Sequence, residues 1–95
     1  MDGVILTTLE KIHHPKGEIL KAIKKSDSVF SEFGEAYFSL IKQGEIKGWK
    51  KHKKMISNLI VINGEIEIVF HNENTKEFLN IIISQNNYQR LTVNA

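Results

Sequence analysis

The chain has 95 residues, of which 41% are apolar and 25% are charged, with a net charge of +2 and no cysteine. Its length allows one domain with a small core, its apolar content excludes a disordered chain, and the missing cysteine excludes disulfides and thiolate chemistry. No apolar run approaches the roughly 18 residues of a membrane span, and the start lacks the pattern of a signal peptide, so we expect a cytoplasmic protein.

The first third of the chain begins with a predicted strand and continues through turns. Residues 4–9 are rich in β-branched side chains, which predicts the strand. Proline and glycine within 13–17 predict a turn. The apolar positions of 18–25 fit a short helix or a strand, and we favour the strand because the remaining segments are β. An irregular turn is then expected to carry Phe30 and Phe33 into the core.

Residues 34–42 form a predicted strand with two different faces. The apolar face holds Ala36, Phe38 and Leu40, and the mixed face holds Glu35, Tyr37, Ser39 and Ile41. A mixed inner face in a small barrel usually lines a pocket. The alternative, weighted equally, is that Tyr37 and Ser39 face water.

A dense basic cluster follows a predicted turn at 43–44, on a predicted strand over 45–54. The cluster consists of Lys47, Lys50, Lys51, His52, Lys53 and Lys54. Ammonium groups contact phosphate oxygens as point charges, so the cluster suits an anionic ligand such as a diphosphate. The adjacent positive charge favours the neutral form of His52, which could then act as a base. The alternative is a solvated basic edge that discourages association between sheets.

The strongest strand signals lie in the second half of the chain. Residues 57–62 and 65–70 flank Asn63-Gly64, and this dipeptide predicts a two-residue hairpin because a type I′ turn needs positive φ at both central positions. The alternation within 65–70 directs Ile66, Ile68 and Phe70 inward and Glu65 and Glu67 outward.

Two further strands complete the predicted fold. A polar turn at 71–76 leads to a strand at 77–84, and a last strand follows at 89–93. Between these two strands, residues 84–88 form a loop or a single helical turn capped by Ser84. About seven short strands at near-regular spacing predict an all-β sandwich or barrel.

Nucleic acid and metal binding are the weaker interpretations. Trp49 lies inside the basic cluster, but the net charge is small and the aromatic residues do not alternate with a long basic stripe. The four histidines are scattered, and no H-x-H pair with a distant glutamate and histidine occurs. We therefore expect no nucleic-acid partner, no metal and no other cofactor.

The basic cluster, the following pair of strands and the last strand together resemble a known family. Gly44-Glu45-Ile46-Lys47-Gly48 resembles the family's glycine-to-arginine-glycine motif with lysine in place of arginine, and Asn63-Gly64-Glu65 matches its turn. Residues 83–93 match its last motif. The family is that of the cupins that act on nucleotide-linked 4-keto-6-deoxy sugars, namely the dTDP-4-dehydrorhamnose 3,5-epimerases and the dTDP-sugar 3,4-ketoisomerases.

The resemblance implies one cupin-type domain over residues 1–95, a double-stranded β-helix or jelly-roll barrel that is short at its carboxyl terminus. It implies an epimerase or ketoisomerase that abstracts a proton next to the C4 ketone of a dTDP-4-keto-6-deoxyhexose. The implied catalytic residues are His52 and Lys50. The implied substrate-binding residues are Lys47, at the diphosphate, Lys54, and Tyr37, Ser39 and Glu35 on the pocket-facing strand.

The chain departs from this family at two places. The family's catalytic histidine falls at Lys50, and the strands that carry the epimerases' acid tyrosine would lie beyond Ala95. Either Lys50 or His52 would then have to act as the base. The alternative is a non-catalytic cupin that binds a sugar nucleotide or serves as an interaction module.

We also expect a homodimer. The chain is small, and the run Leu79, Ile81, Ile82 and Ile83 is apolar on both faces of its predicted strand. A missing carboxyl-terminal strand would leave a sheet edge that needs cover. Strands shared between two subunits would supply that cover.

Overall fold

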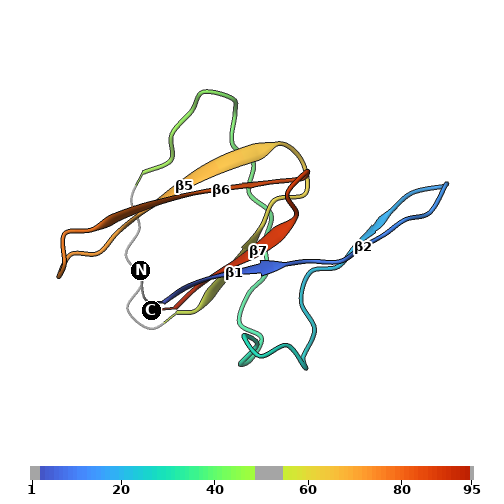
Figure 1. Ribbon diagram of the computed structural model, residues 1–95, viewed down its shortest axis with the longest axis horizontal. Coiled ribbons are helices and arrows are strands. Elements are labelled where there is room, and N and C mark those ends of the chain that lie inside the picture. Colours follow the sequence, from blue (N-terminus) through green and yellow to red (C-terminus); the bar gives the residue numbers. More distant parts are fainter. Residues whose placement is uncertain (1–2, 49–54, 95) are drawn as a thin grey trace.

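The computed structural model describes residues 3–48 and 55–94, and these residues form seven β-strands and no helix (Figure 1). The strands are β1 (Val4–Thr8), β2 (Lys11–Ile12), β3 (Ile19–Leu20), β4 (Ser57–Ile60), β5 (Glu65–His71), β6 (Phe78–Ser84) and β7 (Gln89–Val93). The prediction of an all-β fold is confirmed. Within the described ranges, no helix has the length and apolar character needed to span a membrane.

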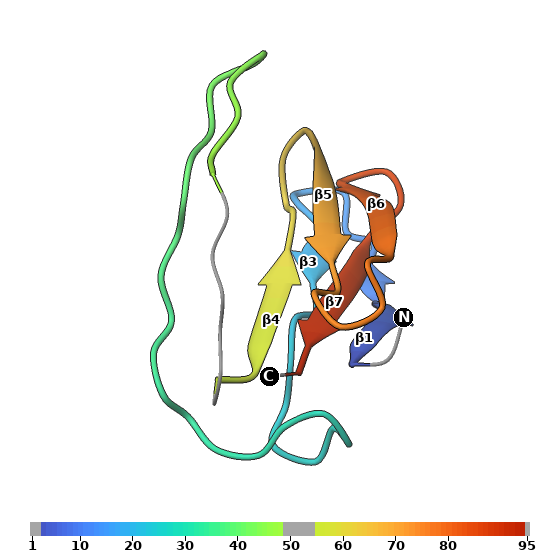
Figure 2. The same ribbon diagram turned by 90° about the vertical axis from the view of Figure 1, so that its left-hand side faces the viewer.

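The strands form three small antiparallel sheets. Strand β7 lies between β1 and β4 in the largest sheet, while β5 pairs with β6 and β2 pairs with β3. Figure 2 shows the β5–β6 sheet lying against the sheet that contains β7. The strands of the described residues do not close into a barrel.

The core lies between the two larger sheets. Its buried centre consists of Leu91 from β7, Ile83 from β6 and Val61, which follows β4. Half-buried side chains of both sheets pack against this centre: Val4, Ile66, Ile68, Phe70, Ile81 and Val93. Three of these come from alternate positions of β5, whose intervening glutamates are exposed, so the predicted inward and outward faces of 65–70 are confirmed.

The predicted hairpin at Asn63-Gly64 is wrong. Strand β4 pairs with β7, and β5 pairs with β6, so the dipeptide joins two different sheets. Gly64 has a positive φ of 86°, but Asn63 does not, and a type I′ turn needs both. Gln85 instead holds this corner, because its side-chain oxygen accepts from Gly64 N at 2.7 Å and its own N donates to Gly64 O at 3.0 Å.

The hairpin that does form joins β5 to β6 through the predicted polar turn. Asn72 organises this turn, since its side-chain oxygen accepts from Asn74 N at 2.9 Å and Thr75 N at 3.2 Å. Lys76 has a positive φ of 62°, and its N donates to Asn72 O. At the next connection, the Ser84 hydroxyl accepts from Asn87 N at 3.0 Å, and no helical turn forms there.

The predicted strand over 34–42 is wrong, and residues 45–48 also lie outside any strand. The remainder of the predicted strand over 45–54 lies outside the described residues. Phe33 is 76% exposed, so its predicted place in the core is wrong as well, whereas Phe30 is half-buried. A strand needs a neighbouring backbone for its hydrogen bonds, and alternation of side chains does not supply that neighbour. We call residues 33–48 the arm.

The segment before the arm is attached to β7 by a buried arginine. Arg90 is 4% exposed, and its Nη1 donates to Ala22 O at 2.7 Å and to Asp27 Oδ2 at 3.2 Å. The same carboxylate oxygen accepts from Lys24 N at 2.9 Å. Within 18–25, only Ile19–Leu20 of the predicted strand forms, and Arg90 instead holds the irregular backbone that follows it.

Replacing Arg90 with methionine should lower the free energy of unfolding by roughly 1–3 kcal/mol. The variant keeps an apolar chain in the buried space but leaves Ala22 O and Asp27 without their donor. Urea denaturation measures the change. Lys24→Met is the matched control, because Lys24 contacts Asp27 through its backbone N, which the substitution keeps. Equal stability of Arg90→Met and wild type would contradict the attachment.

The same contact predicts a dependence of stability on pH. The backbone hydrogen bond from Lys24, opposed in part by desolvation and assisted by the charge of Arg90, holds the pKa of Asp27 below its ordinary value of 3.8. A lowered folded-state pKa stabilises the fold above the unfolded pKa, and this contribution is lost as the pH falls through the lowered value.

Asp27→Asn should therefore be less stable than wild type at about pH 7, and the difference should shrink as the pH falls below about 3.8. Urea midpoints measured at both ends of this range test the prediction. A difference that stays constant with pH would show that the charge of Asp27 contributes nothing.

Candidate functional site

The predicted site residues divide into two groups. Lys50, His52 and Lys54 lie outside the described residues. The other predicted site residues are Glu35, Tyr37, Ser39 and Lys47, and all of them lie in the arm. The arm runs beside the body of the molecule on the side of β4 and doubles back at its far end (Figure 2).

A turn within the arm brings two of the predicted residues together. The turn predicted at 43–44 is confirmed, with Glu45 N donating to Lys42 O at 3.0 Å and Gly44 at a φ of 81°. Across this turn, Lys47 Nζ donates to Ser39 Oγ at 2.7 Å. The arm therefore places an ammonium group and a hydroxyl side by side on an exposed surface.

The other two predicted residues do not join this pair. Tyr37 is 70% exposed, and Glu35 is exposed as well. No strand carries either residue, so the predicted pocket-facing strand is absent from this part of the chain. Of the two interpretations of Tyr37 and Ser39, the one in which they face water agrees with the structure.

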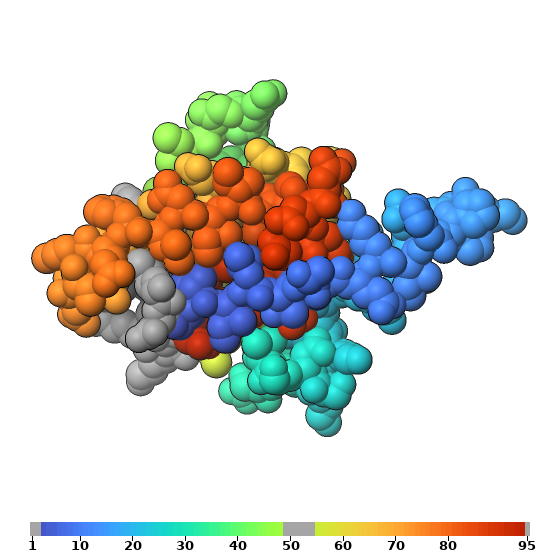
Figure 3. Space-filling view, in the orientation of Figure 1, coloured from blue at the N-terminus to red at the C-terminus, as the bar shows by residue number. Residues whose placement is uncertain are grey.

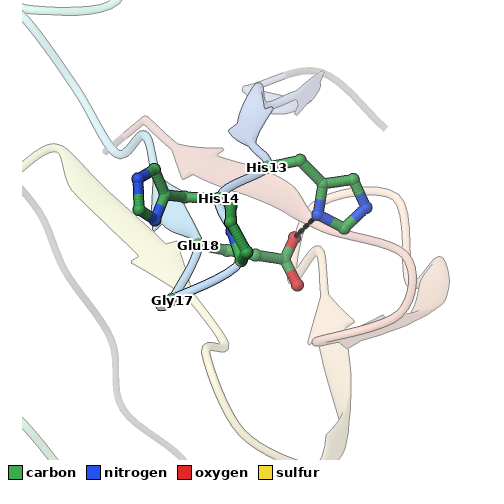
Figure 4. Close-up of a pocket in the computed structure, with 5 residues that line it drawn as sticks. His13, His14, Gly17 and Glu18 are labelled. Atoms are coloured by element: carbon green, nitrogen blue, oxygen red, sulfur yellow. Dashed lines mark ion pairs between the residues drawn. The ribbon is translucent and has the colours of Figure 1, made fainter.

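An open hollow on the described surface lies at the tip of the β2–β3 hairpin. It is lined by His13, His14, Pro15, Gly17 and Glu18. Figure 4 shows the ring of His13 toward Glu18, with Nδ1 at 3.4 Å from Oε2, while the ring of His14 points away. His14 Nδ1 accepts from Lys16 N at 3.0 Å. Among the described residues, no group of three or more metal-ligating side chains is placed to hold an ion.

A second hollow lies where the β2–β3 hairpin meets the loop after β6. Lys11 reaches across it, donating from Nζ to Gln85 O at 2.5 Å, with the amine 5.7 Å from the centre of the Tyr88 ring. Burial raises the pKa of Tyr88. The amine of Lys11 thus connects the β2–β3 hairpin to the segment between β6 and β7, because a cation is attracted both to the carbonyl of Gln85 and to the aromatic face of Tyr88.

Sequence reasoning missed the contacts on the second face of β7. Arg90 and Thr92 share that face and are both buried, and the Thr92 hydroxyl donates to Asn58 Oδ1 at 2.7 Å. Arginine is rarely buried without a partner. The sequence did contain one signal for this burial, namely an arginine next to Leu91 in a predicted strand. Its partner could not be predicted from the sequence, because Asp27 lies 63 residues away.

Comparisons with known proteins give no match, whether against family models, curated proteins or solved structures. The features that suggest a function are the arm, the basic cluster that follows it in the sequence and the motif resemblance.

Proposed function

We propose that the chain binds the diphosphate of a sugar nucleotide through the arm and acts as an epimerase or ketoisomerase on a dTDP-4-keto-6-deoxyhexose. The observation that carries the proposal is the contact of 2.7 Å between Lys47 Nζ and Ser39 Oγ. The motif resemblance implies a substrate-binding role for both residues. The proposal further assumes a cupin-type arrangement, of which the all-β fold is the coarser part.

The Lys47–Ser39 pair has the chemistry of a phosphate contact. An ammonium group carries three donors, and the hydroxyl of Ser39 takes one of them, which leaves two for phosphate oxygens. The hydroxyl can donate its own proton to the same ligand. Lysines of the adjacent basic cluster would add attraction at longer range.

The proposed reaction is a proton transfer beside a ketone. His52, or Lys50 in its neutral form, removes the proton on the carbon next to C4, and the electron pair of that bond moves to the carbonyl as an enolate. A neighbouring donor stabilises the enolate oxygen. Return of a proton to the opposite face of that carbon gives the epimer, whereas transfer of protons between the oxygens and carbons of C3 and C4 gives the 3-keto isomer.

Binding without catalysis is the second candidate. The sequence has Lys50 where the resembling family has its base histidine. The described residues of the arm are also exposed, whereas proton abstraction of this kind profits from a site that excludes water. In this case the chain would hold a sugar nucleotide or present it to another protein.

Lys47→Met should weaken binding of a dTDP-linked sugar about tenfold, because a charged hydrogen bond to phosphate is lost. Ser39→Ala should weaken binding less, about threefold, since a neutral donor is lost. Titration calorimetry measures both. Lys16→Met is the matched control, as it removes an exposed lysine on the distant β2–β3 hairpin. Unchanged affinity in Lys47→Met would exclude the arm as the diphosphate site.

Deuterium exchange separates catalysis from binding. With dTDP-4-keto-6-deoxyglucose in D2O, deuterium at C4 of a 3-keto product would indicate a ketoisomerase, because its C3 carries no hydrogen. In the 4-keto sugar, deuterium at C3 alone would indicate a single-centre epimerase or the reversal of a ketoisomerase, and deuterium at both C3 and C5 would indicate a 3,5-epimerase. His52→Ala should abolish exchange if His52 is the base, and Lys50→Ala if Lys50 is. NMR shifts on ligand addition without any exchange would support the binding candidate and reject the enzyme.

A further inference from the structure

The corner between β4 and β5 contains the only asparagine in the sequence that precedes a glycine, Asn63. Asn63 and Gly64 are both exposed, so water reaches them. In Figure 3, the segment between β4 and β5, drawn in yellow, reaches the surface beside the end of β6, drawn in orange-red. The corner is therefore open to reactions with the solvent.

An asparagine before a glycine is prone to lose its side-chain amide. Asparagine is a thermolabile residue, because the backbone nitrogen of the next residue can attack its side-chain carbonyl carbon. Glycine favours this attack, since it has no Cβ beside its nitrogen and its backbone reaches conformations that other residues avoid. Gly64 already adopts such a conformation, with a positive φ of 86°.

The reaction needs only the chain and water. A bond forms between Gly64 N and Asn63 Cγ, the bond from Cγ to the amide nitrogen breaks, and ammonia leaves with the proton that Gly64 N gives up. Water then opens the resulting cyclic imide, with its hydroxyl on one carbonyl carbon and its other hydrogen on the departing nitrogen. Opening at Cγ gives aspartate, whereas opening at the backbone carbonyl gives isoaspartate.

The side chain of Gln85 holds the attacking nitrogen in the folded chain. Gly64 N donates to Gln85 Oε1 at 2.7 Å, and Gln85 N donates to Gly64 O at 3.0 Å. Because Gly64 N must lose its proton before it attacks Asn63, the hydrogen bond to Oε1 has to break first. Gln85 directly follows β6, so the end of that strand is coupled to the reactive nitrogen.

We infer that Asn63 is a site of spontaneous deamidation and that the side-chain amide of Gln85 sets its rate. Val61 before the corner and Ile66 after it both belong to the core. Isoaspartate adds one backbone carbon between these two residues, and aspartate adds a negative charge beside Glu65. The reaction therefore alters the connection between the two larger sheets. This inference does not depend on the proposed ligand.

Peptide mapping by mass spectrometry after incubation of the full chain measures the rate at each asparagine. Asn63 should convert faster than Asn74, which is exposed in the β5–β6 turn but precedes threonine. Gln85→Ala should convert Asn63 about fivefold faster than wild type, since one hydrogen bond of ordinary strength no longer opposes the attack. Gln85→Glu keeps an oxygen acceptor, so it should react no faster than wild type.

Two controls separate the contact with Gly64 from general effects. Gln89→Ala removes the same kind of amide from a side chain that bonds to Asn87, so Asn63 should react at the wild-type rate. Arg90→Met should destabilise the fold but keeps Gln85, so it should also react at that rate. Equal acceleration in Arg90→Met and Gln85→Ala would mean that unfolding sets the rate, and the inference would be wrong.

Wild type unfolded in urea provides a measurement that does not require a folded variant. It should convert Asn63 faster than the folded chain does, because the contact with Gln85 is then absent. Equal rates in the folded and unfolded chains would overturn the protective role of Gln85, as would equal rates in folded Gln85→Ala and wild type. A rate at Asn63 no higher than that at Asn74 would overturn the site itself.

Discussion

The described fold depends on the pairing and burial of β7. Its backbone bonds to β1 on one edge and to β4 on the other, which joins the first strand of the chain to residues of the second half. Leu91 is fully buried in the core between the sheets, while Arg90 and Thr92 are buried on the other face. A buried polar group costs free energy unless it is hydrogen-bonded. On this second face, Arg90 donates to Ala22 O and Asp27, and Thr92 donates to Asn58. A single strand thereby fixes segments that are distant in sequence.

The arm shows what happens where such pairing is absent. Residues 34–42 of the arm show the two-residue alternation from which a strand was predicted, yet β5 has β6 beside it and the arm has no strand beside it among the described residues. The side chains of β5 pack into the core, and those of the arm are exposed. The arm and β5 therefore differ in whether a neighbouring strand is present, because strand formation requires hydrogen bonds to another backbone segment.

The proposed ligand contact lies in a segment that also exposes large apolar side chains. Lys47 and Ser39 meet across the turn of the arm, and Phe38 and Leu40 alternate with Ser39 along it. A strand directs alternate side chains to opposite faces. If the arm formed a strand, Phe38 and Leu40 would lie on one face, and Ser39, which contacts Lys47, would lie on the other.

The sequence by itself determined the features that depend on neighbouring residues. It predicted the all-β class, the two faces of 65–70, the turns at 43–44 and 71–76 and the last strand at 89–93, because turn chemistry and the two-residue period of a strand are local. Only the tertiary structure decided which strands pair. In the structure, β4 pairs with β7 and not with β5, and Asn63-Gly64 connects two different sheets. Arg90 forms an ion pair with Asp27, and the arm pairs with no strand among the described residues. These choices depend on burial and hydrogen bonding between segments far apart in the chain, which a local pattern does not encode.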